Sequence, residues 1–396
     1  MDKTHRLTGF LADKLPKWSL IIGIIALALG FLLGHSNDQS MYLSYLTAYT
    51  FFISIVLGCM FLVIVQHLAR GGWGVVVRRV PEQMMATIPT FALLFIPILF
   101  GMHSLYEWTH ASAVAHDHLL QMKAPYLNVP FFVIRNIIYF AVWIGIARYY
   151  NRKSLAQDYV ASDDEAEQIT AGMQKRSAIS ILLYALTVSF ATFDWMMSLK
   201  PHWFSTVFGV YYFAGAVMTA LCFISLTYMI LGRHKHLDTV VTKEHYHDLG
   251  KLIYGFVIFW TYIAFSQFFL TWYANIPEFV QWYLPRSVGP WRTMASVLVW
   301  GHFLIPLFVF MSRHAKRNLK VHSGIAILLL VMQYLDIQFL IKPNFFTDIH
   351  FTLVDVAFLI GIGGIVLNRF LVRLKQESLM PVNDPYLQES LDLEVY

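Results

Sequence analysis

The chain has 396 residues, of which 57% are hydrophobic and 13% are charged, and its formal net charge is +5. Such an apolar composition is typical of an integral membrane protein and excludes an ordinary water-soluble globular enzyme. The positive net charge would suit nucleic acid, but the basic residues are divided among short connections between apolar runs. We therefore expect no nucleic-acid partner.

Apolar runs of about twenty residues recur along the whole chain, and each is long enough to cross a bilayer. There are ten, near 18–34, 42–67, 84–106, 130–150, 177–198, 204–231, 249–272, 291–312, 322–341 and 351–374. This pattern predicts an all-α polytopic membrane protein of about ten transmembrane helices.

We expect a single membrane domain over residues 1–374. Helices two to five (42–198) and six to nine (204–341) would each form a four-helix bundle, flanked by helices one and ten. The connection 151–176 is predicted to form a short surface helix. The polar tail 375–396 is expected to lie along a partner or to be loose.

Lys and Arg residues are distributed unevenly between the two sides of the predicted membrane domain. Twenty-three flank the side that carries both termini, five flank the other side, and Arg135 lies within a span. Positive residues are retained on the cytoplasmic side of membrane proteins. We therefore predict a multi-pass protein of the bacterial inner membrane with both termini in the cytoplasm.

The sequence offers no convincing metal site. Cys59 and Cys222 both lie inside apolar runs, so a disulfide or cysteine cluster is not expected. The outer connection 107–129 contains three histidines and Asp117, but their spacing fits no closed zinc site. Only two histidines, at different predicted depths, lie well inside spans, so we expect no haem and no metal bound by this chain.

Ionisable and amide side chains within the spans concentrate in the outer half of the membrane. An intramembrane ionisable residue suggests function, because burying its charge costs roughly 2.5–3.5 kcal/mol. His103 and Glu107 are expected one turn apart on one helical face. The proton-handling candidates are Asp194, Asp336, His103, Glu107, His302 and Asp355, and His202 and Gln267 are candidate outer-surface contacts.

Asp194 in helix five and Asp336 in helix nine occupy corresponding places if the two bundles are copies of one four-helix unit. Helices five and nine are four spans apart and therefore cross the membrane in the same direction, so this repeat would be parallel. Each carboxylate could handle protons or could be one half of a structural ion pair, and both interpretations stay open. Arg135 is interpreted as a structural partner of Asp194 or Glu107. His302 is interpreted as a hydrogen-bonded packing residue rather than a ligand.

Four segments resemble a known family. They are HLARGGWG (67–74), TFDWMMSLKPHWFSTVFGVYYF (192–213), WYANIPEFVQWY (272–283) and HFLIPLFVFMSRHAKRN (302–318). Together with ten helices, they resemble the membrane subunits of the NrfD/polysulfide-reductase type. The resemblance is greatest to one of the two sister subunits of this type in bacterial alternative complex III, a quinol:cytochrome c oxidoreductase. Phe279 stands where a further polar residue would be expected, which weakens any role for a carboxylate pair there.

The resemblance implies a respiratory complex that supplies the redox groups in other subunits. The implied partners are membrane lipids, a sister membrane subunit of the same type, an iron–sulfur subunit, c-type cytochrome subunits and a terminal oxidase. Quinol would react in the complex, with iron–sulfur clusters and haem c in the partners and no cofactor on this chain. The resemblance implies a scaffold that conducts protons, and not an enzyme by itself.

Two other classes are alternatives. A secondary transporter also uses repeats and midplane charges, but Pro89, Pro97 and Pro306 do not match between the two halves as broken transporter helices would. A purely structural membrane anchor would have every buried charge paired. Copurification with haem-bearing proteins would distinguish a redox subunit from a transporter.

Overall fold

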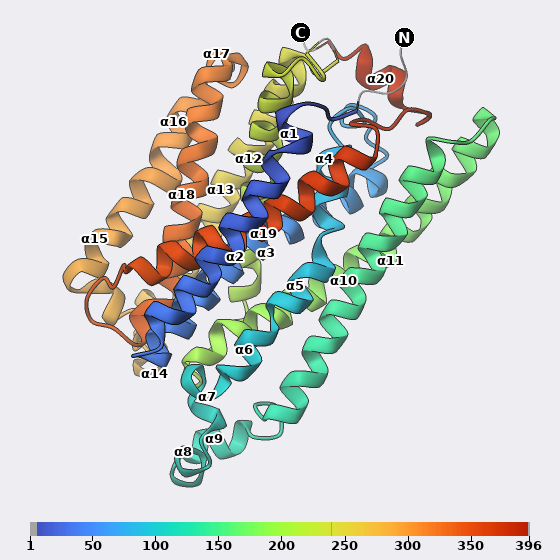
Figure 1. Ribbon diagram of the computed structural model, residues 1–396. Helices are drawn as coiled ribbons and strands as arrows, with labels where there is room; N and C mark the ends of the chain where they lie inside the picture. Colours follow the sequence, from blue (N-terminus) through green and yellow to red (C-terminus); the bar gives the residue numbers. More distant parts are fainter. Residues whose placement is uncertain (1–5, 239, 395–396) are drawn as a thin grey trace.

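The computed structural model describes residues 6–238 and 240–394, and within them the chain is all helical with ten helices that can span a membrane (Figure 1). The predicted polytopic all-α membrane protein is therefore confirmed. The spans are α2 (Leu15–Gly34), α3 (Asp38–Leu68), α4 to α6 (Arg79–Met85, Ile88–Leu94, Ile96–Phe100), α10 (Val129–Gln157), α11 (Asp163–Trp195), α12 (Phe208–Arg233), α13 (Lys243–Ala274), α15 to α16 (Gly289–Leu298, Ile305–Met311), α18 (Leu319–Ile341) and α19 (Leu353–Gln376).

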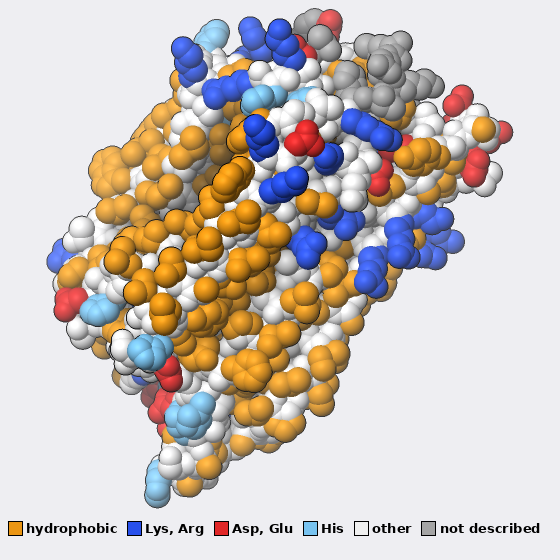
Figure 2. Space-filling view, viewed as in Figure 1, with side chains coloured by type: hydrophobic (Ala, Val, Ile, Leu, Met, Phe, Trp, Pro, Cys, Tyr) orange, Lys and Arg blue, Asp and Glu red, His pale blue; other side chains and the backbone are white. Residues whose placement is uncertain are grey.

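Short helices join the spans at the two sides of the molecule. On the side that carries both termini, here called the terminal side, lie α1 (Phe10–Asp13), α17 (Arg313–Arg317) and α20 (Leu387–Leu391). On the opposite side lie α7 (Met102–Leu105), α8 (Ala111–His116), α9 (His118–Lys123) and α14 (Pro277–Val280). Lys and Arg side chains gather over the terminal side in Figure 2, and an apolar surface covers the middle of the molecule. The direction of insertion stays a prediction.

The core lies where α3 meets α12, the two most deeply buried spans. α3 also contacts α4, α11 and α19, and α12 also contacts α13 and α18. The flanking helices α2 and α19 pack closely against each other. A side chain at Gly23 would lie 2.9 Å from the backbone nitrogen of Ile365, so small residues allow the two backbones to touch.

The connection 151–176 differs from the prediction of a separate short surface helix. α10 continues without a break to Gln157 and α11 begins at Asp163, so two membrane helices extend beyond the bundle as one hairpin (Figure 1). Ser162 caps α11 by accepting a hydrogen bond from the backbone N–H of Glu165. Acidic residues in the first turn favour a helix start at that point.

The third span begins earlier than predicted and is segmented. Its first helix, α4, starts at Arg79 rather than near residue 84, and α5 and α6 follow with prolines in their first turns. Pro89 and Pro97 each remove a backbone donor, which interrupts the hydrogen-bond ladder. The early start places Arg79 and Glu82 inside the packed interior.

Over residues 377–394 the tail packs on the terminal side of its own chain, so it is not loose. That it lies along a partner stays a prediction. Asp384 is buried and accepts a hydrogen bond from Arg78 at 2.5 Å. Ser390 donates to the carbonyl of Trp73 at 2.7 Å. Buried polar residues of the preceding connections thus supply partners within the same chain, which the sequence of the tail alone could not reveal.

Candidate functional site

Asp194 lies near the end of α11 in a fully compensated environment. The Arg135 guanidinium donates from Nε to one carboxylate oxygen at 2.8 Å and from Nη2 to the other at 2.9 Å. The Tyr139 hydroxyl donates a third hydrogen bond at 2.8 Å. All three side chains are fully or largely buried, so this is a bidentate ion pair in a low-dielectric interior.

The neighbouring residues hold this ion pair in place. Arg135 and Tyr139 are one turn apart on α10, so both face α11. Trp195 donates to Asn136 at 2.7 Å, which ties the same two helices together. The Tyr126 ring lies 3.8 Å from the guanidinium and its carbonyl accepts from Arg135. Of the two predicted partners for Arg135, the structure therefore brings Asp194 and not Glu107 into contact.

Asp336 lies near the end of α18 and has a different environment. It is buried, and one carboxylate oxygen accepts a hydrogen bond from Tyr211 at 2.6 Å. The other oxygen has no hydrogen-bond partner among the described residues, and no described Lys, Arg or His forms an ion pair with it. An ionised carboxylate here would be a buried charge without a counter-ion, which is the costly case.

Further polar groups surround Asp336, and we call Tyr211, Trp260, His302 and Asp336 the second-bundle cluster. They come from α12, α13, the segment between α15 and α16, and α18. The ring centroids of Trp260 and His302 are 3.9 Å apart, and those of Tyr211 and Trp260 are 5.6 Å apart. Within the described chain neither ring nitrogen of His302 has a hydrogen-bond partner. The hydrogen-bonded packing role predicted for His302 is therefore not seen.

The backbone at His302 is a π-helix, Val299–Leu304, inserted between α15 and α16. Pro306 lies four residues after His302 and cannot donate to its carbonyl, so the regular ladder fails at this point. Gly301 packs against Met332 of α18 so closely that an added Cβ would lie 2.4 Å from the sulfur atom. The wider helix therefore directs His302 into the interior beside Trp260.

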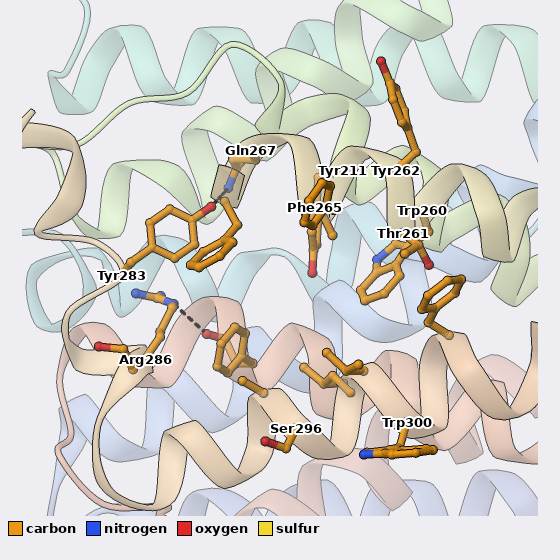
Figure 3. Close-up of a pocket in the computed structure, with 18 of the residues that line it drawn as sticks. Tyr211, Trp260, Thr261, Tyr262, Phe265, Gln267, Tyr283, Arg286, Ser296 and Trp300 are labelled. Atoms are coloured by element: carbon orange, nitrogen blue, oxygen red, sulfur yellow. Dashed lines mark hydrogen bonds between the residues drawn. The ribbon is translucent and has the colours of Figure 1, made fainter. Parts of the chain in front are cut away.

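A cavity of about 840 Å³ lies beside this cluster, between α13 and α15 (Figure 3). Tyr211 and Trp260 form part of its wall, so the cavity reaches two members of the second-bundle cluster. Gln267, predicted as an outer-surface contact, is instead buried in the cavity wall, where it accepts from Ser205 and donates to Tyr283, both at 3.2 Å. The depth of Gln267 in the membrane does not predict that it lies on the inward face of α13, because the rotation of the helix decides which face it occupies.

His103 and Glu107 do not lie one turn apart on a helical face. α7 ends at Leu105, Tyr106 is extended, and Glu107 begins a short 3-10 turn that ends at Thr109. Both side chains are exposed, and His103 packs its ring against His110 at 3.8 Å. The predicted intramembrane pair is therefore wrong, because the segmented third span ends before Glu107.

Two other predicted residues have specific partners. Asp355 is buried, pairs with Lys342 at 2.6 Å and caps α19 by accepting from the backbone N–H of Thr352 at 2.8 Å. His202 is half exposed and pairs with Asp117 at 2.5 Å. This bond holds the pKa of the Asp117 carboxyl below its ordinary value. Neither residue reaches the second-bundle cluster through a hydrogen bond in the described structure.

The terminal side contains a buried charged network that the apolar pattern of the sequence does not indicate. Arg78 donates to Glu82 at 2.9 Å, and Arg79 pairs with Glu82 at 3.2 Å and with Asp158 at 2.6 Å. Burial raises the pKa of Asp158 to about 6 although Arg79 opposes the shift. Buried ionisable residues are therefore not confined to the outer half, as the sequence had suggested. A proline two residues after Arg79 was the available signal for a helix start.

Within the described residues no group of three or more His, Cys, Asp and Glu side chains could hold a metal ion. A scan against protein-family models finds no match to the chain, and a search of curated proteins finds no similar protein. The two buried carboxylates, Asp194 and Asp336, differ in whether they form an ion pair among the described residues. Asp336 can gain or lose a proton without breaking an ion pair, whereas protonation of Asp194 would leave Arg135 as an uncompensated buried cation.

Proposed function

We propose that this chain is a membrane subunit of a quinol:cytochrome c oxidoreductase of the alternative complex III type, in which it supports the complex and handles protons at Asp336. The observation that carries the proton-handling role is the environment of this carboxylate. It is buried, receives one hydrogen bond from Tyr211 and forms no described ion pair.

Proton handling needs a group that can change its charge and neighbours that can pass a proton on. Tyr211 is both a hydrogen-bond donor to Asp336 and a wall residue of the cavity. His302 offers two ring nitrogens without protein partners in the described structure, close to Trp260. A proton that arrives at the cavity could therefore pass by way of the Tyr211 hydroxyl to Asp336.

The respiratory context rests on the resemblance of four segments to a membrane subunit of alternative complex III. Two of those segments contain the residues on which the geometry depends: 192–213 includes Asp194 and Tyr211, and 302–318 begins at His302. In the proposal, iron–sulfur clusters and c-type haems belong to partner subunits, and quinol is the substrate of the whole complex. The cytoplasm then lies on the terminal side.

The first experiment tests the context. An affinity tag on this chain, followed by gentle detergent extraction, should copurify c-type cytochromes and a quinol:cytochrome c oxidoreductase activity. Haem absorbance and peptide mass spectrometry of the purified material give the readout. A chain that purifies alone and binds a small solute would instead be a transporter, and the proposal would be wrong.

The second experiment tests the residue. Asp336→Asn should leave the complex assembled but slow its turnover or abolish proton release during quinol oxidation. Asp194→Asn is the matched control, because it should reduce assembly and activity together. If Asp336→Asn keeps full turnover and full proton release, Asp336 handles no protons in this protein.

A further inference from the structure

The cavity beside the second-bundle cluster opens sideways toward the surface that faces lipid. Several of its wall residues are strongly exposed on the apolar flank of the molecule, including Tyr262, Phe265 and Trp300. Figure 3 shows the Trp260 ring between the two helices, the Tyr262 ring pointing away from the space and Trp300 at its opposite edge. A lipid-facing opening of this kind admits a hydrophobic molecule directly from the bilayer.

The polar end of the cavity carries positive charge and no negative charge. Arg286 and Arg292 both line it, and no described Asp or Glu is among its wall residues. Both arginines lie near the opposite-side ends of the spans, Arg286 in the connection after α14 and Arg292 in the first turn of α15. Headgroups lie at that level of a bilayer.

Arg286 is a buried cation whose described protein partners are all neutral. It is 3% exposed and donates to the carbonyls of Trp282 at 2.6 Å, Phe339 at 3.1 Å and Leu340 at 2.8 Å. It also donates to the Asn344 side chain at 3.1 Å, which leaves one N–H of Nη1 without a described partner. The Trp282 ring lies 3.4 Å from the guanidinium carbon.

The missing counter-charge affects the pKa of Arg286. Burial without a carboxylate partner lowers the pKa of Arg286 to about 9, so the side chain is still charged at neutral pH. A buried charge with only dipoles around it is costly, and an anion at the polar end of the cavity would compensate it. The hydroxyls of Ser287 and Ser296 in the same wall already donate to the carbonyls of Leu284 and Arg292, so the arginines are the donors that face an anion.

We propose that this cavity is a binding site for a phospholipid with an anionic headgroup. The phosphate lies at Arg286 and Arg292, and an acyl chain lies along the aromatic wall toward Trp300 and Phe303. This inference does not depend on the proposed function, because it uses only the shape and charge of the cavity.

The charge of the site selects among the hydrophobic molecules of a membrane. A neutral quinol would leave the Arg286 guanidinium uncompensated. A zwitterionic lipid would bring an ammonium group for which the described cavity wall has no acidic partner. Only an anionic headgroup matches two arginines and no carboxylate, and its free energy of binding benefits from both cations.

The test uses the complete purified protein, in its complex if it copurifies with one, after lipid removal by detergent exchange. Dioleoyl phosphatidylglycerol is compared with dioleoyl phosphatidylcholine by native mass spectrometry and by thermal unfolding. We expect the phosphatidylglycerol to remain bound at higher detergent concentration and to raise the unfolding midpoint by several degrees. Inorganic phosphate should do neither, because it cannot fill the apolar slot.

Two variants locate the site without disturbing Arg286, whose removal could unfold the connection. Arg292→Gln should weaken phosphatidylglycerol binding about fivefold, since one cation near a headgroup contributes roughly 1 kcal/mol. Ala295→Trp should fill the slot and abolish binding of this lipid. Lys200→Gln and Val297→Trp are matched controls on the same side and on the same helix, and neither residue lines the cavity.

Three results would overturn the proposal. They are equal binding of the two lipids, retention of phosphatidylglycerol binding by Ala295→Trp, and an equal loss in the control variants. Preferential displacement of phosphatidylglycerol by a neutral quinone would also contradict it, because the cavity would then select for the ring and not for charge.

Discussion

The two predicted bundles each contain a carboxylate near the end of a helix, Asp194 in α11 and Asp336 in α18, and the surroundings of these two carboxylates differ. In the first bundle Asp194 receives three hydrogen bonds, two of them from Arg135. In the second bundle Asp336 receives one, from Tyr211. A shared position in a helix therefore does not imply a shared chemical role; the partner on the neighbouring helix decides it.

The difference extends to the space around each carboxylate. The ion pair of Asp194 and Arg135 is covered by the rings of Tyr126 and Phe131, whose centroids lie 3.8 Å and 4.4 Å from the guanidinium carbon. Asp336 lies next to a cavity of about 840 Å³ through Tyr211. The Asp194 carboxylate is thus fully hydrogen-bonded and paired, whereas the Asp336 carboxylate is incompletely hydrogen-bonded and close to a cavity.

The largest expected effect comes from breaking the ion pair between Asp194 and Arg135. Asp194→Asn should destabilise the protein by about 3–5 kcal/mol, because it leaves the Arg135 cation buried without a counter-charge. The free energy of unfolding in detergent, or the folded yield if unfolding is irreversible, gives the measurement. The double variant Asp194→Asn, Arg135→Gln should recover part of the loss. An unchanged stability of the single variant would show that the pair is not structural.

A smaller effect is expected at the two tyrosines. Tyr211→Phe removes the one described donor to Asp336 and should cost about 1–3 kcal/mol. Tyr139→Phe should cost about 1 kcal/mol or less, since Arg135 still satisfies Asp194. The comparison of the two unfolding free energies is the test. Equal costs would contradict the idea that the bundles differ in how completely each carboxylate is bonded.

Replacement of Asp336 should lower the free energy of unfolding less than replacement of Asp194. Asp336→Asn keeps an oxygen that can accept from Tyr211 and leaves no charge behind, so we expect a loss of about 1 kcal/mol, from amide hydrogens without partners. The same unfolding measurement applies, with Asp194→Asn as reference. A cost as large as that of Asp194→Asn would mean that Asp336 has an ionic partner in the assembled protein.

The smallest effect concerns the connection that covers the first bundle. The His202 hydrogen bond holds the pKa of Asp117 below its ordinary value of 3.8, so its stabilising contribution is present above that pH and is lost as pH falls through the folded-state pKa. Limited proteolysis of residues 106–128 should accelerate in that acidic range. Asp117→Asn should already show the faster cleavage at neutral pH, without a measurable change in global unfolding. Cleavage that is independent of both pH and this substitution would exclude a role for the pair.

Local composition was sufficient to predict the spans. The ten apolar runs matched the helices because hydrophobic length is a property of consecutive residues, and the bilayer sets that length. The largest errors came where backbone chemistry interrupts a run, as in the third span with Pro89 and Pro97. There the apolar pattern continues although the helix does not, so His103 and Glu107 were placed on a turn that is absent.

The sequence by itself determined the membrane architecture and the presence of a carboxylate near the end of helix five and of helix nine. Only the tertiary structure decided that Asp194 has a guanidinium partner and that Asp336 has none among the described residues. It also brings Arg78, Arg79 and Glu82 into one network of ion pairs with the tail residue Asp384. The cavity beside Arg286 likewise follows only from the packing of several helices. The physical reason is that depth follows from position along one helix, whereas pairing depends on the rotation and packing of several helices at once.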